Sequence, residues 1–156
     1  MRKVIVSIIG PSQPSKEVAE TAYQVGKLVG ARGWVLLSGG RTGVAEWASR
    51  GAKESGGLTV GVLPEATPES ANPYIDIAIP SGMHEARNFI VVNAADAVIA
   101  IGTSFGTISE MAMALRIGKF MVGLHIPKPF ILPVREVDSP EEAVSIVAEY
   151  LEGRKR

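Results

Sequence analysis

The sequence predicts a single α/β domain, a Rossmann-like three-layer αβα sandwich with a mainly parallel sheet. Two observations support this fold class. Apolar, β-branched runs of strand length alternate with helical patterns along the whole chain. Turns rich in Gly, Ser and Pro separate each run from the next pattern. Alternation of this kind implies right-handed crossovers between parallel strands, so helices should cover both faces of the sheet.

Strands are expected wherever an apolar run is too short for a helix and ends at a turn signal. They lie at residues 3–9, 34–37, 58–63, 74–79, 97–101 and 120–124, with a short edge candidate at 134–137. Helices are expected between Ser15 and Gly33, over residues 44–55 and 83–95, from the turn after residue 101 to Gly118, and from Ser139 to Leu151. Ser15 and Ser139 are the expected N-caps, and Pro140 suits the first position of the last helix. These elements make one domain over residues 1–152, and a basic tail at 153–156 is expected to fray.

Residues 97–110 form the central stretch of this prediction. The stretch begins as a wholly apolar run, breaks at Gly102, and continues through small hydroxyl residues into a helix. Backbone N–H groups at such a turn point outward, and the helix dipole adds partial positive charge, so the turn suits a phosphate or a carboxylate. Glu110 is expected in the first turn of that helix. Either it complements the helix dipole on a solvated face, or it faces a bound ligand.

Four turns are expected to meet at one edge of the sheet, because each follows a parallel strand. They comprise residues 10–12, 38–43, 81–87 and 102–107. Open α/β sheets bind ligands in the crevice outside the carboxyl ends of their strands. The topology alone therefore predicts a small-molecule site where these turns converge.

Arg87 is expected in the first turn of a helix, where the helix dipole disfavours a cation. A cation placed there needs an anionic partner. Glu85 can supply one from within the chain, and an anionic ligand can supply one from outside. His84 and His125 are the only histidines, which is too few for a histidine metal site, so no metal is expected.

Composition narrows the function classes. The chain of 156 residues carries 16 basic and 16 acidic side chains, so its formal net charge is zero and favours neither nucleic acid nor an anionic membrane as a partner. It contains no cysteine, which excludes a disulfide framework, a thiolate metal site and a cysteine nucleophile. No apolar segment reaches membrane-spanning length, and the amino terminus leads directly into a strand. We therefore expect a cytoplasmic protein without nucleic-acid or membrane partners.

Three motifs resemble those of one known family. Residues 38–45 read S-G-G-x-x-G-V-A, residues 83–88 read M-H-E-A-R-N, and A-D-A-V-I-A at 95–100 precedes G-T-I-S-E at 106–110. In this order, over roughly residues 3–124, they are similar to the LONELY GUY superfamily, which was long labelled "possible lysine decarboxylase" and includes molybdenum cofactor carrier proteins. No lysine of this chain lies in a recognisable pyridoxal phosphate context, so a PLP-dependent lysine decarboxylase is not expected.

The resemblance implies a nucleotide-binding protein. Its best-known members are phosphoribohydrolases that cleave cytokinin riboside 5′-monophosphates to the free base and ribose 5-phosphate. By this resemblance Arg87 and Glu110 are the catalytic residues. The expected phosphate- or nucleotide-binding residues are Gly39, Gly40, Gly43, Gly102, Gly106 and Thr107, with Gly10, Ser38, Thr103 and Ser104 in the same turns. Thr103 and Ser104 replace part of the family's P-G-G signature, and Asn88 replaces a basic residue. By these differences the chain resembles the family's short, uncharacterised branch and its cofactor-carrier branch more than the plant-hormone enzymes.

Two functions therefore remain open. The chain is either a phosphoribohydrolase acting on a nucleoside 5′-monophosphate, or a non-catalytic carrier or sensor of a nucleotide or of the molybdenum cofactor. A DNA-processing protein of the same fold is disfavoured by the zero net charge. Either function needs a small nucleotide or phosphoribosyl ligand, and no cofactor is required beyond a bound nucleotide or phosphate. Apolar side chains such as Trp47 and Phe89 on the predicted helices, together with the assemblies of related proteins, predict a homo-oligomer, a dimer or a tetramer.

Overall fold

Seven parallel strands form one sheet in the computed structural model, which describes residues 1–155. The order across the sheet is β4-β3-β2-β1-β5-β6-β7. The strands are β1 (Ile5–Ile9), β2 (Val35–Ser38), β3 (Leu58–Leu63), β4 (Ile77–Pro80), β5 (Ala97–Ile101), β6 (Met121–Leu124) and β7 (Arg135–Glu136). The chain runs outward from β1 to β4, returns to β5 beside β1, and then runs outward to β7. The strand order therefore reverses between β1 and β5, which is where doubly wound sheets form their ligand crevice.

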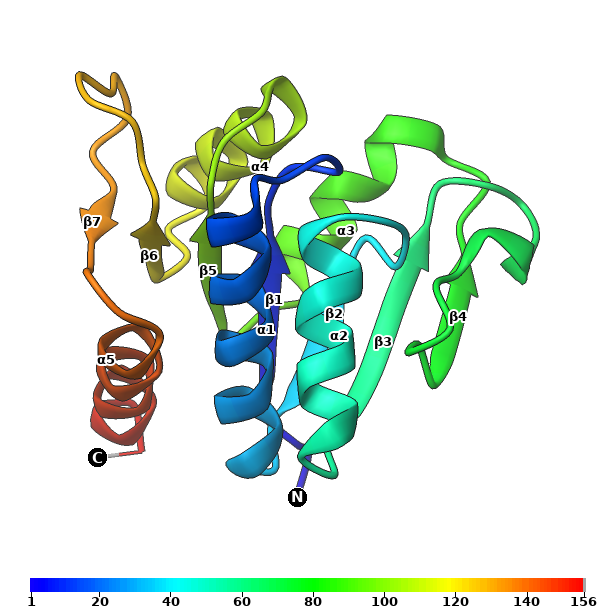
Figure 1. The fold of residues 1–156 in the computed structure, drawn as a ribbon, viewed down its shortest axis with the longest axis horizontal. Helices are drawn as coiled ribbons and strands as arrows, with labels where there is room; N and C mark the ends of the chain where they lie inside the picture. Colours follow the sequence, from blue (N-terminus) through cyan, green and yellow to red (C-terminus); the bar gives the residue numbers. More distant parts are fainter. Residues whose placement is uncertain (156) are drawn as a thin grey trace.

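Helices cover both faces of this sheet, as the sequence predicts. They are α1 (Lys16–Ala31), α2 (Val44–Glu54), α3 (Arg87–Asn93), α4 (Phe105–Arg116) and α5 (Pro140–Gly153), with short 3-10 turns at Pro68–Ser70 and His84–Ala86. In Figure 1, α1 and α2 lie in front of the sheet and α3 and α4 lie behind it. The buried apolar side chains divide in the same way: one cluster joins the strands to α1, α2 and α5, and the other joins them to α3 and α4. The three-layer αβα sandwich is confirmed.

Two predicted N-caps are present. The Oγ atoms of Ser15 and Ser139 accept hydrogen bonds from the backbone amides of Val18 and Glu142, at 3.2 and 3.1 Å, and so satisfy donors that the first helical turn leaves free. Pro140 is the first residue of α5, where a missing N–H costs nothing.

Helices α1 and α2 pack unusually closely. A Cβ at Gly26 of α1 would overlap the backbone carbonyl of Ala48 in α2. Only glycine allows the two helix backbones to approach this closely, so the small residues of these helices fix the position of α2 and of the turn that precedes it.

Several expected boundaries are wrong, among them the start of β1, which is Ile5 rather than residue 3. Strand β4 begins at Ile77 rather than at residue 74, because the chain first turns at Asn72, whose carbonyl accepts a hydrogen bond from the amide of Ile75 at 3.2 Å. The helix expected over 83–95 is a 3-10 turn that gives way to α3 at Arg87, with His84 at a φ of 51°. Helix α5 continues to Gly153, two residues beyond the expected end. Of the basic tail, Arg156 lies outside the described residues.

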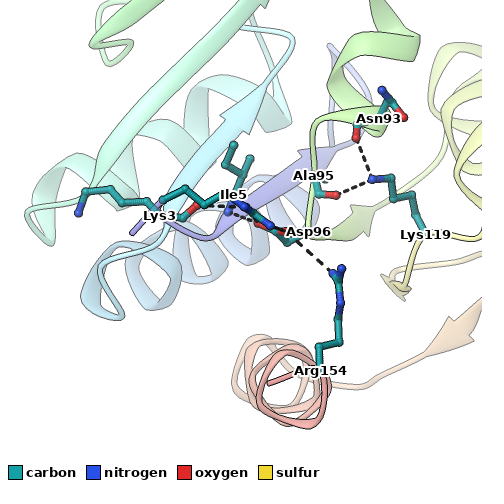
Figure 2. A network of polar contacts seen from close by, with 8 residues as sticks. Lys3, Ile5, Asn93, Ala95, Asp96, Lys119 and Arg154 are labelled. Atoms are coloured by element: carbon teal, nitrogen blue, oxygen red, sulfur yellow. Dashed lines mark hydrogen bonds and ion pairs between the residues drawn. The ribbon is translucent and has the colours of Figure 1, made fainter. Parts of the chain in front are cut away.

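The amino-terminal edge of the sheet is held by a network of polar contacts, shown in Figure 2. The Asp96 carboxylate accepts hydrogen bonds from the Arg2 guanidinium at 2.7 and 2.9 Å and from the Ile5 amide at 2.9 Å. Arg154, in the tail, approaches the same carboxylate at 3.9 Å. Asp96 thus joins the first strand to the last helix, on the edge opposite the converging turns. No helix within residues 1–155 is long and apolar enough to span a membrane.

Candidate functional site

A polar cavity of about 420 Å³ lies at the carboxyl-terminal edge of the sheet. Four turns contribute to its wall: those after β1, β2 and β5 and the turn that leads into α3. Its lining residues are Ile8, Ile9, Gly10, Ser12, Gly39, Arg41, Thr42, Ala45, Glu85, Arg87, Asn88, Ser104, Gly106, Thr107 and Glu110. The convergence predicted from topology is therefore present, and the structure brings both expected catalytic residues, Arg87 and Glu110, into one cavity.

Arg87 is the first residue of α3 and so lies in a first helical turn, as the sequence predicts, although that helix begins later than expected. Its Nε is buried and has no hydrogen-bond partner. Burial lowers the pKa of its guanidinium, and the negative charges of Glu110, Glu65 and Glu85 act in the opposite direction. None of the ion pairs found among residues 1–155 includes Arg87. Glu85 therefore does not pair with Arg87, although that was one of the two expectations for this cation.

The guanidinium of Arg87 packs on the backbone of the turn after β2. A Cβ at Gly39 would overlap its Nη1 atom. Gly39 is thus needed for the arginine to enter the cavity, and its role is to admit that side chain.

Glu110 lies deeper than expected. It is the sixth residue of α4 and so belongs to the second turn, not the first. Only 8% of its surface is exposed, which rules out an acid on a solvated face. Burial raises the pKa of Glu110 to about 7, and the charge of Arg87 offsets this effect only in part. At neutral pH the carboxyl group is therefore close to its midpoint of ionisation, as is suited to a group that exchanges protons.

The helix start after β5 carries its own cap. The Ser104 Oγ accepts a hydrogen bond from the Thr107 amide at 3.2 Å and lies 2.9 Å from the Thr107 hydroxyl. This amide is therefore satisfied within the chain. A serine in this part of the signature provides an internal acceptor that a glycine lacks.

The helix start after β2 is different. Its N-cap is Gly43, which has no side chain to accept a hydrogen bond. One amide of the first turn, that of Val44, donates to the Pro11 carbonyl at 3.1 Å. Ala45 lines the cavity next to Arg41 and Thr42. This end of α2 adds partial positive charge beside the two arginines of the cavity.

Five of the expected binding residues do not line the cavity. These are Ser38, Gly40, Gly43, Gly102 and Thr103. The Ser38 hydroxyl is buried and accepts the Gly40 amide at 3.1 Å. Gly40 has a φ of 76°, and a Cβ there would stand 2.9 Å from the Cα of Gly61 in β3. Both residues therefore shape the turn, because glycine alone permits this conformation and this close approach. Gly102 and Thr103 line a second cavity instead.

Sequence reasoning placed the turn after β2 at the site but did not assign the Arg41 side chain to it. Arg41 lines the cavity and pairs with Glu65 at 3.4 Å. Asn72, in the irregular segment after β3, holds this turn: its backbone amide donates to the Gly40 carbonyl at 2.9 Å and its Nδ2 donates to the Arg41 carbonyl at 2.7 Å. A single asparagine in a loop rich in Pro and Ser gives no sequence signal for such a contact.

Fold and site together define a Rossmann-like protein with a cation-bearing cavity at the carboxyl edge of its sheet. Residues 3–150 match the model of the SLOG cluster4 family, and the chain belongs to this family. The resemblance to the LONELY GUY and molybdenum cofactor carrier superfamily is thereby confirmed.

Two relatives illustrate the range of similar sequences. An uncharacterised protein of Archaeoglobus fulgidus is 41% identical over 145 residues, which cover 93% of this chain and 95% of that protein. A cytokinin riboside 5′-monophosphate phosphoribohydrolase of Mycobacterium tuberculosis is 31% identical over 119 residues. That match covers 74% of this chain but only 62% of the mycobacterial enzyme.

Among solved structures, two similar chains match almost end to end. The molybdenum cofactor binding protein of Rippkaea orientalis has a TM-score of 0.90 and 37% identity. The molybdenum cofactor carrier protein of Chlamydomonas reinhardtii has a TM-score of 0.89 and 31% identity. Each match covers 97% of this chain and 99% of the other.

Proposed function

We propose that this protein binds a small phosphate monoester, a nucleotide or a related phosphorylated compound, in the cavity at the carboxyl edge of the sheet. The observation that carries the proposal is the unpartnered Nε of Arg87, buried in the wall of that cavity. A guanidinium keeps its charge at all ordinary pH values and is costly to bury without an anion. A phosphate presents two oxygens that the planar guanidinium can bind as a bidentate pair.

The surroundings of Arg87 support the same ligand class. Arg41 supplies a second cation, and the start of α2 supplies a helix dipole that no side chain caps. Hydroxyl groups of Ser12 and Thr42 line the same wall. At about 420 Å³ the cavity lies within the range of small-molecule sites, which is roughly 300 to 1,000 Å³.

Glu110 favours one enzymatic form of this function, hydrolysis of the N-glycosidic bond of a nucleoside 5′-monophosphate. In that reaction the C1′–N bond breaks, the oxygen of water bonds to C1′, and a water proton passes to the departing base. The Glu110 carboxylate would stabilise positive charge on the sugar, or accept the proton of the attacking water. Arg87 would hold the phosphate. This reaction uses only groups of the chain and water.

A carrier function is favoured by two other observations. The two solved structures described above, which match almost the whole chain, are named as binding or carrying the molybdenum cofactor, whereas the hydrolase relative matches over part of its length. In addition, Ser104 caps the start of α4 from within, where the hydrolase signature carries glycine. A carrier would use the same cavity to hold the phosphate of its cargo and would leave that cargo unchanged.

The binding proposal is tested by calorimetric titration with inorganic phosphate and with AMP. Arg87→Ala should weaken both ligands by roughly tenfold to a hundredfold, the loss of one charge-assisted contact. The control is Arg116→Ala, which removes an exposed arginine at the end of α4, outside the cavity, and should leave both affinities unchanged. If the wild-type protein binds neither ligand at millimolar concentration, or if Arg87→Ala binds both as well as wild type, the proposal is wrong.

The two forms of the function are separated by chromatography of released base. A hydrolase should release base from at least one common nucleoside monophosphate, and Glu110→Gln should abolish the release while phosphate affinity persists. A wild-type protein that binds AMP and releases no base from any of these substrates is a carrier or sensor.

A further inference from the structure

A second cavity, of about 390 Å³, lies beside the first. The loop after β1 and the turn after β5 stand between the two cavities. Alternate residues of the loop after β1 line the two cavities: Gly10 and Ser12 line the first, and Pro11 and Gln13 line the second. The turn after β5 contributes Gly102 and Thr103 to the second cavity and Ser104 to the first. The two cavities thus share their border at the point where the strand order reverses between β1 and β5.

The second cavity differs from the first in chemistry. Arginine and glutamate side chains line the first cavity. The second is lined by no lysine, arginine, aspartate or glutamate of the described residues. Its walls are formed largely by Pro11, Pro14, Ile126 and Pro127, with the amide of Gln13 and the ring of His125. Walls of this kind suit a flat, uncharged ring with a few polar atoms at its edge.

His125 is an exposed residue of this wall. It directly follows β6 and has a φ of 54°, an uncommon conformation for a residue with a side chain. Its Nε2 lies 2.8 Å from the Thr21 hydroxyl of α1. That contact restrains the ring, and no hydrogen bond to its Nδ1 is found among residues 1–155. Constrained backbone of this kind concentrates at ligand sites.

We infer that the second cavity is a subsite for the planar heterocycle of a ligand whose phosphate lies in the first cavity. The inference rests on the proposed binding of a phosphate monoester and adds the class of group attached to that phosphate. A nucleobase and a pterin share this chemistry, since each is a flat, nitrogen-containing ring system. The apolar walls pack against its faces, and Gln13 and His125 face its polar edge.

The test compares ribose 5-phosphate, AMP and a pterin monophosphate by calorimetry, with base release monitored in the same samples. Wild-type protein should bind at least one of the two ring-bearing ligands more tightly than ribose 5-phosphate, by about fivefold to a hundredfold, the effect of stacking one ring. His125→Gly should remove most of that difference and leave the affinity for ribose 5-phosphate unchanged. Because glycine adopts positive φ without a steric cost, this variant should keep the backbone conformation of residue 125. His125→Asn, which also tolerates this conformation but has no ring, should show the same loss.

The two ring-bearing ligands identify the source of the heterocycle. A larger effect of His125→Gly on AMP indicates a nucleobase subsite, and a larger effect on the pterin monophosphate indicates a pterin subsite. Both outcomes support the inference.

Three outcomes overturn it. If ribose 5-phosphate binds as tightly as both ring-bearing ligands, the second cavity takes no ring, although the phosphate proposal stands. If His125→Gly binds all three ligands as wild type does, and Phe105→Ala instead loses affinity for the ring-bearing ones, the ring packs on the 96% exposed Phe105 at the start of α4. If no phosphorylated ligand binds at all, the inference fails together with the proposed function.

Discussion

Replacing Glu110 with glutamine should make the protein more stable at neutral and alkaline pH, although it removes a residue of the candidate site. The carboxyl group is buried, and its pKa is raised to about 7 mainly because burial penalises its charged form. A group whose folded pKa lies above its unfolded value contributes stability that is fully present below the unfolded pKa. That stability is lost as the pH rises from the unfolded value of 4.5 through the folded value of about 7.

The size of the effect follows from the shift. Each unit of pKa corresponds to about 1.4 kcal/mol, so a rise from 4.5 to about 7 costs the wild-type protein about 3 kcal/mol at pH 8. At pH 5 the same shift costs about 0.8 kcal/mol. Glutamine does not ionise, so Glu110→Gln should gain about 2 to 3 kcal/mol relative to wild type between pH 5 and pH 8.

Urea denaturation of both proteins at several pH values measures this gain directly. Glu149→Gln is the matched control, because Glu149 belongs to α5 and is exposed. The control should follow wild type at every pH. A stability difference between Glu110→Gln and wild type that is constant from pH 5 to pH 8 would mean that Glu110 ionises as an exposed residue does, and the reasoning about its burial would be wrong.

Four further predictions concern packing and assembly. Asp96→Ala should lower the free energy of unfolding by about 1 to 3 kcal/mol in urea denaturation, since it leaves the part-buried Ile5 amide without this acceptor. The pKa of the Asp96 carboxyl group is lowered chiefly by its hydrogen bonds with Arg2. The greater stability of the wild-type protein should therefore persist above pH 3.8 and disappear as the pH falls through the lower pKa that Asp96 has in the folded protein. Gly39→Ala should weaken phosphate binding by roughly tenfold in calorimetry, with little change in melting temperature, because only the flexible guanidinium must move. Gly26→Ala should lower the free energy of unfolding by about 1 to 3 kcal/mol and lower the melting temperature, since the new methyl group would overlap backbone atoms of α2. Light scattering should give the mass of at least a dimer, because α2 and α3 expose large apolar side chains.

The fold could be predicted from the sequence because its signals are local. Apolar runs such as Leu58–Leu63 and capping serines such as Ser15 act within a few residues of the chain. The boundaries that failed depend on contacts beyond that range. Strand β4 starts late because Asn72 is bonded to a distant turn, and no pattern within residues 74–79 reports this contact.

The candidate site was predicted in its location and only partly in its details. Parallel topology places every turn after a strand at one edge, so Arg87 and Glu110 could be assigned to one site. Their burial could not be predicted, because it depends on how α3 and α4 pack on the sheet. Glycine signals were ambiguous for the same reason. Gly39 admits Arg87 to the cavity, whereas Gly40 packs against β3, and a sequence of two adjacent glycines does not distinguish the two roles.

The second cavity was not predicted at all. Its walls combine the loop after β1 with His125, and the two segments are distant in sequence. His125 was considered only as a metal ligand. Its positive φ and its contact with Thr21 arise from tertiary structure and leave no trace in the order of residues.

A crystal structure of the wild-type protein grown with AMP tests the central claim most directly. We expect the phosphate to contact the Arg87 guanidinium between the start of α2 and the turn after β5. A phosphate bound away from Arg87, or one held only by exposed residues outside the cavity, would contradict the account.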